Sequence, residues 1–115
     1  MSTAICSQER IRLSQDEREK LNPLFSEYLD RFSDATVYLF GSRVHPEQKG
    51  GDLDLLVLSG QAAPHAYDLA KRLRLAIKEA LGDQQVDILI SPAPRANDQT
   101  PFIRLTLLEG VQIWP

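Results

Sequence analysis

The stretch GSRVHPEQKGGDLDLLVLSG, residues 41–60, decides the fold class, because it leads from a Gly-Ser turn through two aspartates into an apolar strand. Side chains alternate between the two faces of a strand, so Asp52 and Asp54 are expected to point the same way, while the leucines beside them point to the other face. The two carboxylates therefore share one site beside a buried strand. Acids near a turn also occur because they solvate the start of a strand, and for the pair alone both interpretations stand.

The length and composition predict one globular domain, residues 1–115, with residues 1–13 as a loose or separately packed arm. Thirteen basic and sixteen acidic residues give a formal net charge of −3, so neither a broad nucleic-acid surface nor a membrane surface is expected. The single cysteine, Cys6, excludes an internal disulfide and agrees with a reducing compartment. With no long apolar run, the expectation is a cytoplasmic protein.

An amphipathic helix is expected at about 15–32, since apolar residues recur there at intervals of three and four. Ser14 and Glu17 have the spacing of a capping box at its start. Pro23 is unfavourable inside a helix, so the helix either bends there or begins near Asn22.

The remaining pattern predicts one mixed sheet covered by helices, which is the α/β (α+β) fold class. Along the chain, segments with helical periodicity alternate with apolar segments rich in β-branched residues, and these segments end at glycines or prolines. The expected elements are strands at 35–40, 52–58 and 85–91, helices at 65–81 and from 97 or 98 to 109, and an edge strand at 111–114.

A third acid lies inside the strand predicted at 85–91, where Asp87 stands between Val86 and Ile88. If this strand neighbours the one at 52–58, three carboxylates converge at one end of the sheet. Such a lone acid is also common at an edge or a turn. Acids brought close together repel one another unless a cation is present, and hard oxygen ligands favour Mg²⁺ or Mn²⁺.

The turn Gly41-Ser42 follows the strand at 35–40 directly. Glycine permits a positive φ, and a serine N–H and hydroxyl can both donate to phosphate oxygens. Arg43 can add a charged contact to phosphate. A Gly-Ser pair alone is a simple turn, but beside an aspartate cluster it suits a nucleoside triphosphate that binds together with magnesium.

Gly41-Ser42, nine further residues, Asp52-Leu53-Asp54, and Asp87 in a later strand together resemble the nucleotidyltransferase superfamily of the DNA polymerase β type. Within it, the chain is similar to the minimal nucleotidyltransferases that act as antitoxins in HEPN/MNT toxin–antitoxin pairs. The resemblance covers roughly residues 14–114, and the nine-residue interval is one shorter than the commonest form.

The resemblance implies a palm-like fold and the transfer of AMP from ATP to a tyrosine hydroxyl of a cognate HEPN ribonuclease toxin, which silences the toxin. Asp52, Asp54 and Asp87 would then bind the metal ions, with Asp87 also helping to deprotonate the hydroxyl. Gly41 and Ser42 would hold the triphosphate.

Two alternatives to this function remain open from the sequence. The chain can inhibit its partner by binding alone, without chemistry. It can also act on a small molecule or an RNA end, as other superfamily members do, although its net charge of −3 disfavours long RNA.

Overall fold

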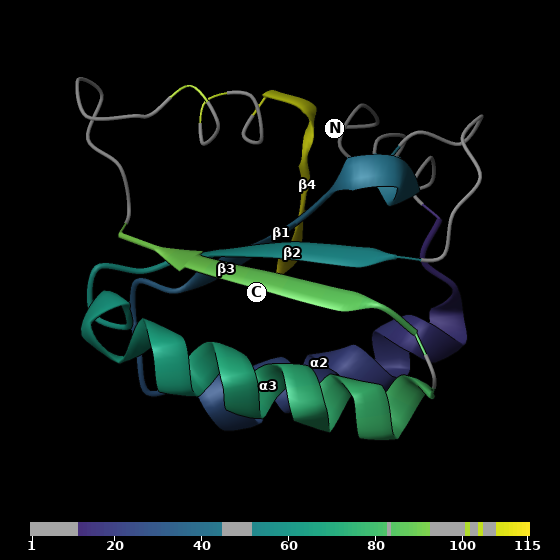
Figure 1. The fold of residues 1–115 in the computed structure, drawn as a ribbon, viewed down its shortest axis with the longest axis horizontal. Coiled ribbons are helices and arrows are strands. Elements are labelled where there is room, and N and C mark those ends of the chain that lie inside the picture. The colour runs from purple at the N-terminus through teal and green to yellow at the C-terminus, as the bar shows by residue number, and fades with distance from the viewer. Residues whose placement is uncertain (1–11, 45–51, 83, 93–100, 102–103, 105–107) are drawn as a thin grey trace.

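The structure is a computed structural model of the 115-residue chain. It describes residues 12–44, 52–82, 84–92, 101, 104 and 108–115. In this part of the chain, four strands form one sheet with two α-helices on one side of it (Figure 1). The predicted mixed sheet covered by helices is therefore confirmed.

The sheet has the strand order β3-β2-β1-β4. β1 pairs antiparallel with both β2 and β4, whereas β2 and β3 are parallel. The parallel pair requires a crossover, which helix α3 supplies. The strands are β1 (Thr36–Phe40), β2 (Leu53–Leu58), β3 (Val86–Ser91) and β4 (Val111–Trp114).

Helix α2 (Gln15–Leu29) begins with the predicted capping box. The Glu17 N–H donates to Ser14 Oγ over 3.1 Å, and the Ser14 N–H donates to Glu17 Oε1 over 3.0 Å. The helix continues through Pro23 rather than beginning near Asn22, and it ends at Leu29 instead of residue 32.

Helix α3 (Ala66–Leu81) follows a short 3-10 turn, η2 (Ala63–His65), and ends at Gly82. Its buried residues are Leu69, Leu73 and Ile77, which face the sheet and α2. None of the helices within the described residues is both long and apolar enough to cross a bilayer.

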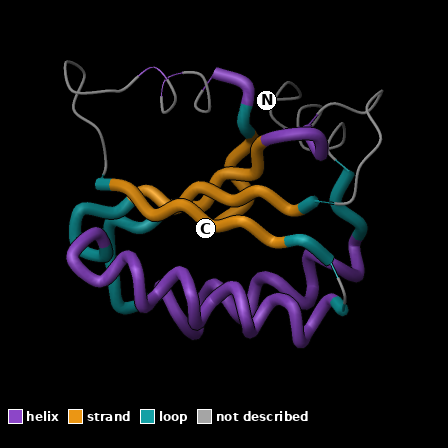
Figure 2. Tube along the Cα trace, in the orientation of Figure 1, coloured by secondary structure: helices purple, strands orange, loops and turns teal. Residues whose placement is uncertain are grey.

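The main core lies between the helices and one face of the sheet, as the two layers in Figure 2 show. Phe25 and Leu29 of α2 are fully buried there, together with Leu53 and Leu55 of β2. At the sheet edge, the Trp114 ring of β4 lies 6.2 Å from the Phe25 ring, so Trp114 anchors the C-terminal strand to the core.

Two predicted segments are described only in part. Residues 1–11 of the predicted arm lie outside the described residues, but its end is packed: Leu13 is buried, and the Arg12 N–H donates to the Arg43 carbonyl over 2.7 Å. Of the helix predicted up to residue 109, the structure describes only scattered helical positions, the last being Leu108 and Glu109.

Candidate active site

The site begins at Gly41, the first residue after β1. Its φ of +78° is a conformation that side chains other than glycine rarely adopt. A β-carbon here would also lie 3.2 Å from Asp54 Cγ and would collide with the Asp54 carboxylate. Glycine therefore does two things at this position: it turns the chain out of β1, and it lets the backbone pass directly beside an acid of β2.

The residues after Gly41 form a single 3-10 turn, η1 (Gly41–Val44), which contains the backbone of Ser42. The Ser42 side chain lies outside what the structure describes. The turn sits at the end of β1 and contacts β2, so Ser42 is on the same end of the sheet as Asp54.

Arg43 is buried, with 6% of its surface exposed. Its Nη1 donates to the Arg12 carbonyl over 2.8 Å and to Glu17 Oε1 over 3.0 Å, and its Nη2 donates to Gln84 Oε1 over 2.8 Å. The guanidinium thus joins α2, η1 and the segment before β3. Because these partners occupy it, Arg43 supports the turn, and its predicted phosphate contact is not carried into the proposed function.

The ion pair with Arg43 lowers the pKa of Glu17. Partial burial acts to raise the pKa of Glu17, but the hydrogen bonds and charge of Arg43, with bonds from Ser14 and Gln84, outweigh it and hold that pKa below its ordinary value. The ionised pair therefore stabilises the folded chain at neutral pH.

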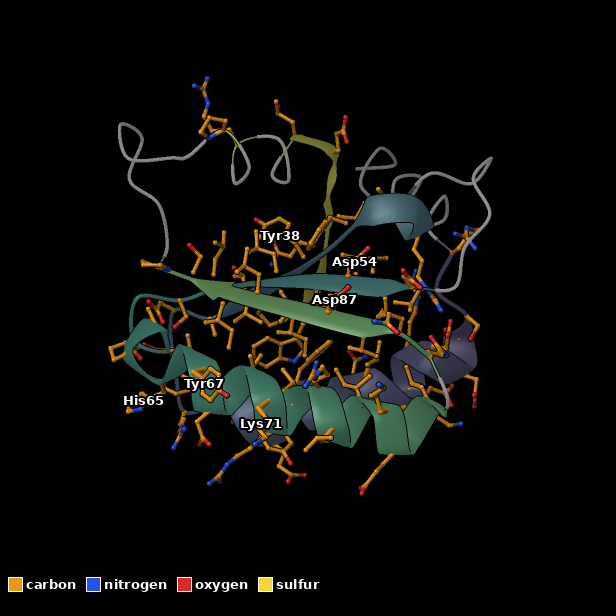
Figure 3. All side chains as sticks on the ribbon, in the orientation of Figure 1. Tyr38, Asp54, His65, Tyr67, Lys71 and Asp87 are labelled. Atoms are coloured by element: carbon orange, nitrogen blue, oxygen red, sulfur yellow. The ribbon has the colours of Figure 1, made fainter. Side chains whose placement is uncertain are left out.

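Asp54 and Asp87 lie beside each other on neighbouring parallel strands. They are direct partners in the β2–β3 register, and adjacent strands lie about 4.8 Å apart. Both carboxylates are on the face of the sheet away from the helices (Figure 3). The neighbouring residues Leu53 and Val86 point into the core, as the alternation predicts. The expected proximity of the two strands and their acids is confirmed.

The electrostatics of the pair follow from this placement. The pKa of Asp54 is raised above its ordinary value, first by partial burial, then by the negative charges of Asp87 and Asp52, and also by a hydrogen bond with Asp87. Asp52 precedes β2 and is exposed. Its negative charge still helps to raise the pKa of Asp54, so the three acids interact electrostatically.

The fit of a metal ion depends on these donors. Among the described residues, no group of three or more His, Cys, Asp or Glu side chains is arranged to hold a metal ion, so the predicted three-carboxylate arrangement is reduced to the Asp54–Asp87 pair. Mg²⁺ usually binds through one or two carboxylates together with substrate phosphates. The carboxylates of Asp54 and Asp87 lie side by side, and their repulsion helps to raise the pKa of Asp54. Such a pair fits an Mg²⁺ ion that substrate phosphates also coordinate.

The sequence matches the family described as "Nucleotidyltransferase domain" over residues 21–112. This match spans Gly41 and the three acids, and it covers most of the chain. The chain belongs to the nucleotidyltransferase domain family, and nucleotidyl transfer is the general chemistry that this membership supports. None of the curated proteins matches the chain.

Some residues around the site were not predicted from the sequence. Gln84 and Glu17 hold Arg43 in place, yet Glu17 was identified only as part of the capping box. Lys71 and Arg74 of α3 line a pocket that also contains Asp87. On a helix, such cations follow the pattern of a solvated face, so only the three-dimensional structure relates them to the acids.

Proposed function

We propose that the chain transfers AMP from ATP to a hydroxyl group of a protein. The observation that carries the proposal is the pairing of Asp54 with Asp87 next to the glycine turn at Gly41. Two acids that repel each other reduce the stability of the fold, and such pairs are typical of functional sites. Family membership adds the class of chemistry, nucleotidyl transfer.

In the proposed reaction, the acceptor hydroxyl oxygen attacks the α-phosphorus of ATP. A bond forms between that oxygen and the α-phosphorus, and the bond from the α-phosphorus to the oxygen bridging to the β-phosphorus breaks. Pyrophosphate leaves with that oxygen, and the hydroxyl proton passes to a carboxylate of Asp87 or to water. The products are an AMP-modified protein and pyrophosphate.

Each site residue has a proposed role in this reaction. The backbone of Gly41 and Ser42 holds the triphosphate at the end of β1, because exposed N–H groups in a turn attract phosphate oxygens. Asp54 and Asp87, with Asp52 nearby, would hold Mg²⁺ or Mn²⁺. A bound divalent ion would supply charge neutralisation on the triphosphate and the leaving pyrophosphate.

We further propose that the acceptor is a tyrosine of a HEPN ribonuclease toxin and that the modification silences it. The support is the resemblance of the Gly-Ser and Asp-x-Asp pattern, residues 41–54, to the minimal nucleotidyltransferases of HEPN/MNT pairs. Positioning supplies much of the catalysis in group transfer, so an acceptor protein that docks beside the acids can itself complete the site.

The test is to incubate the chain with ATP, magnesium and a candidate HEPN acceptor protein, and then to weigh the HEPN protein by intact mass spectrometry. A magnesium-dependent gain of one or more AMP units supports the proposal. Asp52→Asn/Asp54→Asn is the control, and it should abolish the gain. If the partner is neutralised equally by this variant and gains no mass, the chain acts by binding alone and the proposed catalysis is wrong.

A further inference from the structure

A pocket of about 500 Å³ lies beside the candidate active site, between helix α3 and strand β3. Asp87 is part of its wall. We name it the α3–β3 pocket and define it by six of its lining residues: Phe40, Tyr67, Lys71, Arg74, Asp87 and Leu89. Because it includes an acid of the site, anything bound in it lies next to the reacting groups.

We propose that the α3–β3 pocket binds an extended, acidic segment of the acceptor protein, which adds to the edge of β3 and brings its hydroxyl to Asp87. This inference rests on the proposed function for the reaction that follows binding. It adds the place where the acceptor docks, the conformation of the docking segment and the charge that the segment carries.

The extended conformation follows from the edge of β3. This strand is at the end of the sheet order, so one of its edges has no neighbouring strand among the described residues. Four successive residues, 87–90, line the pocket, and their side chains alternate between the two faces of the sheet. The pocket therefore runs along the edge itself. An edge of this kind offers backbone N–H and C=O groups to an added strand.

The side chains along this edge also favour a polypeptide. Leu89 of β3 is 42% exposed and Tyr67 of α3 is 86% exposed, so the pocket presents two large side chains to solvent. Both line the pocket. An added strand can cover them with alternate side chains while its backbone pairs with β3.

The acidic character follows from Lys71 and Arg74. Both cations line the pocket from α3, and neither makes an ion pair with another residue in the described part of the chain. Arg72, between them, is paired with Asp68 over 3.0 Å and is not part of the pocket wall. Asp87 is the one acid among the described lining residues, so Lys71 and Arg74 leave the pocket wall with a net positive charge, which favours an acidic partner.

A second copy of this chain fits the same edge less well. In a two-fold symmetric pairing the same patch faces itself, so Lys71 and Arg74 would oppose their own copies. RNA would use the cations but would leave the backbone groups of β3 unpaired. An acidic strand satisfies both features.

The experiment selects short random peptides from a display library on the full chain in the absence of ATP. Selected peptides should be enriched in Asp and Glu among β-forming residues. Their binding, measured by fluorescence anisotropy, should weaken about tenfold or more in Lys71→Glu/Arg74→Glu. Arg72→Glu/Lys78→Glu is the matched control, because it makes the same charge change on the same helix outside the pocket, and its binding should stay within about twofold.

Two further peptides sharpen the test. Replacing the acids of a selected peptide by lysine should restore binding to Lys71→Glu/Arg74→Glu and abolish it for the unaltered chain. N-methylation of alternate backbone nitrogens on the pairing edge should prevent binding, because it removes the donors that an added strand needs.

Equal binding to both charge-reversal variants, insensitivity to N-methylation, a dimer formed through β3, or a preference for single-stranded RNA over any peptide would each overturn the inference. A separate assay of AMP transfer to the HEPN partner distinguishes the two proposals. Transfer that is unaffected by Lys71→Glu/Arg74→Glu refutes the docking site and leaves the function intact. Peptide binding without any transfer refutes the function and leaves the docking site intact.

Discussion

Asp54 of β2 and Asp87 of β3 are direct partners across a parallel strand pair, and the charge of Asp87 helps to raise the pKa of Asp54. The fold therefore holds two like charges together at the edge of its core. This arrangement destabilises the ionised state of Asp54. A cation bound between the two carboxylates would offset the repulsion, which is why such pairs are typical of functional sites.

Replacing Asp87 by Asn is expected to stabilise the chain while abolishing nucleotidyl transfer. In the absence of metal and nucleotide, the free energy of unfolding at pH 7 should rise by roughly 0.3–1 kcal/mol, because one of the repelling charges is removed. Urea denaturation in the presence of EDTA measures this change. Asp52→Asn is the comparison, and it should give a smaller gain, since Asp87 contributes more than Asp52 to the raised pKa of Asp54. A loss of stability in Asp87→Asn would contradict the account.

Gly41→Ala is expected to remove activity by displacing the Asp54 carboxylate. The new β-carbon would meet that carboxylate, and the φ of +78° would be strained, so stability should fall by about 1–3 kcal/mol. AMP transfer and ATP binding should both be lost in the fraction that stays folded, as measured by intact mass and by calorimetry.

The chain contains a matched control for this substitution. Gly82 has a φ of +95°, yet a β-carbon there meets no atom of the described residues within 4 Å. Gly82→Ala should therefore cost a similar amount of stability and leave ATP binding unchanged. If both variants lose ATP binding equally, general strain rather than the contact with Asp54 accounts for the effect.

From the sequence, only the face of the strand on which each acid of the site lies could be predicted, because side chains alternate along a strand. Asp54 and Asp87 are each flanked by apolar residues, so the face on which each one lies follows from the pattern. That the two strands are neighbours in parallel register is a matter of topology, which no local pattern contains. Arg43 shows the same limit: a cation after a Gly-Ser turn suggests phosphate, but its partners Glu17 and Gln84 are distant in sequence.

The course of α2 was also only partly predictable. Pro23 disfavours a helix locally, but Leu21, Phe25 and Leu29 are spaced by one turn across it and are all buried. The burial of those three side chains contributes several kcal/mol, which exceeds the roughly 3 kcal/mol that a proline costs inside a helix. Tertiary packing therefore overrides the local preference.

Pro23→Ala is accordingly expected to stabilise the chain. Pro23 is exposed, and alanine restores a backbone donor inside the helix, so the free energy of unfolding should rise by about 2 kcal/mol after allowance for the more flexible unfolded chain. Thermal and urea denaturation measure the gain. Asn22→Ala, at the exposed neighbouring position, serves as the control for a general increase in helix propensity. Destabilisation by Pro23→Ala would show that the proline makes a specific contact.

The pH dependence of stability should reveal the Glu17–Arg43 ion pair. Glu17→Gln keeps a side chain that can complete the capping box but removes the charge, and it should lower the free energy of unfolding at pH 7 by about 1–3 kcal/mol. The pKa of Glu17 is lowered on folding, so this contribution is fully present above its ordinary value of 4.5 and is lost as the pH falls through the lower folded value.

Denaturation of both proteins between pH 7 and about pH 3 tests this sign. The difference between the unaltered chain and Glu17→Gln should shrink as the pH falls below 4.5. Glu19→Gln, an exposed change on the same helix, should show a much smaller difference at every pH. A difference for Glu17→Gln that grows toward low pH would mean that the ion pair does not stabilise the fold.

The most direct test of the central claim is to follow which phosphate of ATP reaches the acceptor. The HEPN partner is incubated with the chain, magnesium and ATP labelled on either the α- or the γ-phosphate. Nucleotidyl transfer by the Asp54–Asp87 site predicts that the α-label becomes attached to the partner, that the γ-label leaves as pyrophosphate, and that Asp54→Asn/Asp87→Asn abolishes both. Attachment of the γ-label, or α-labelling that persists in this variant, would contradict the account.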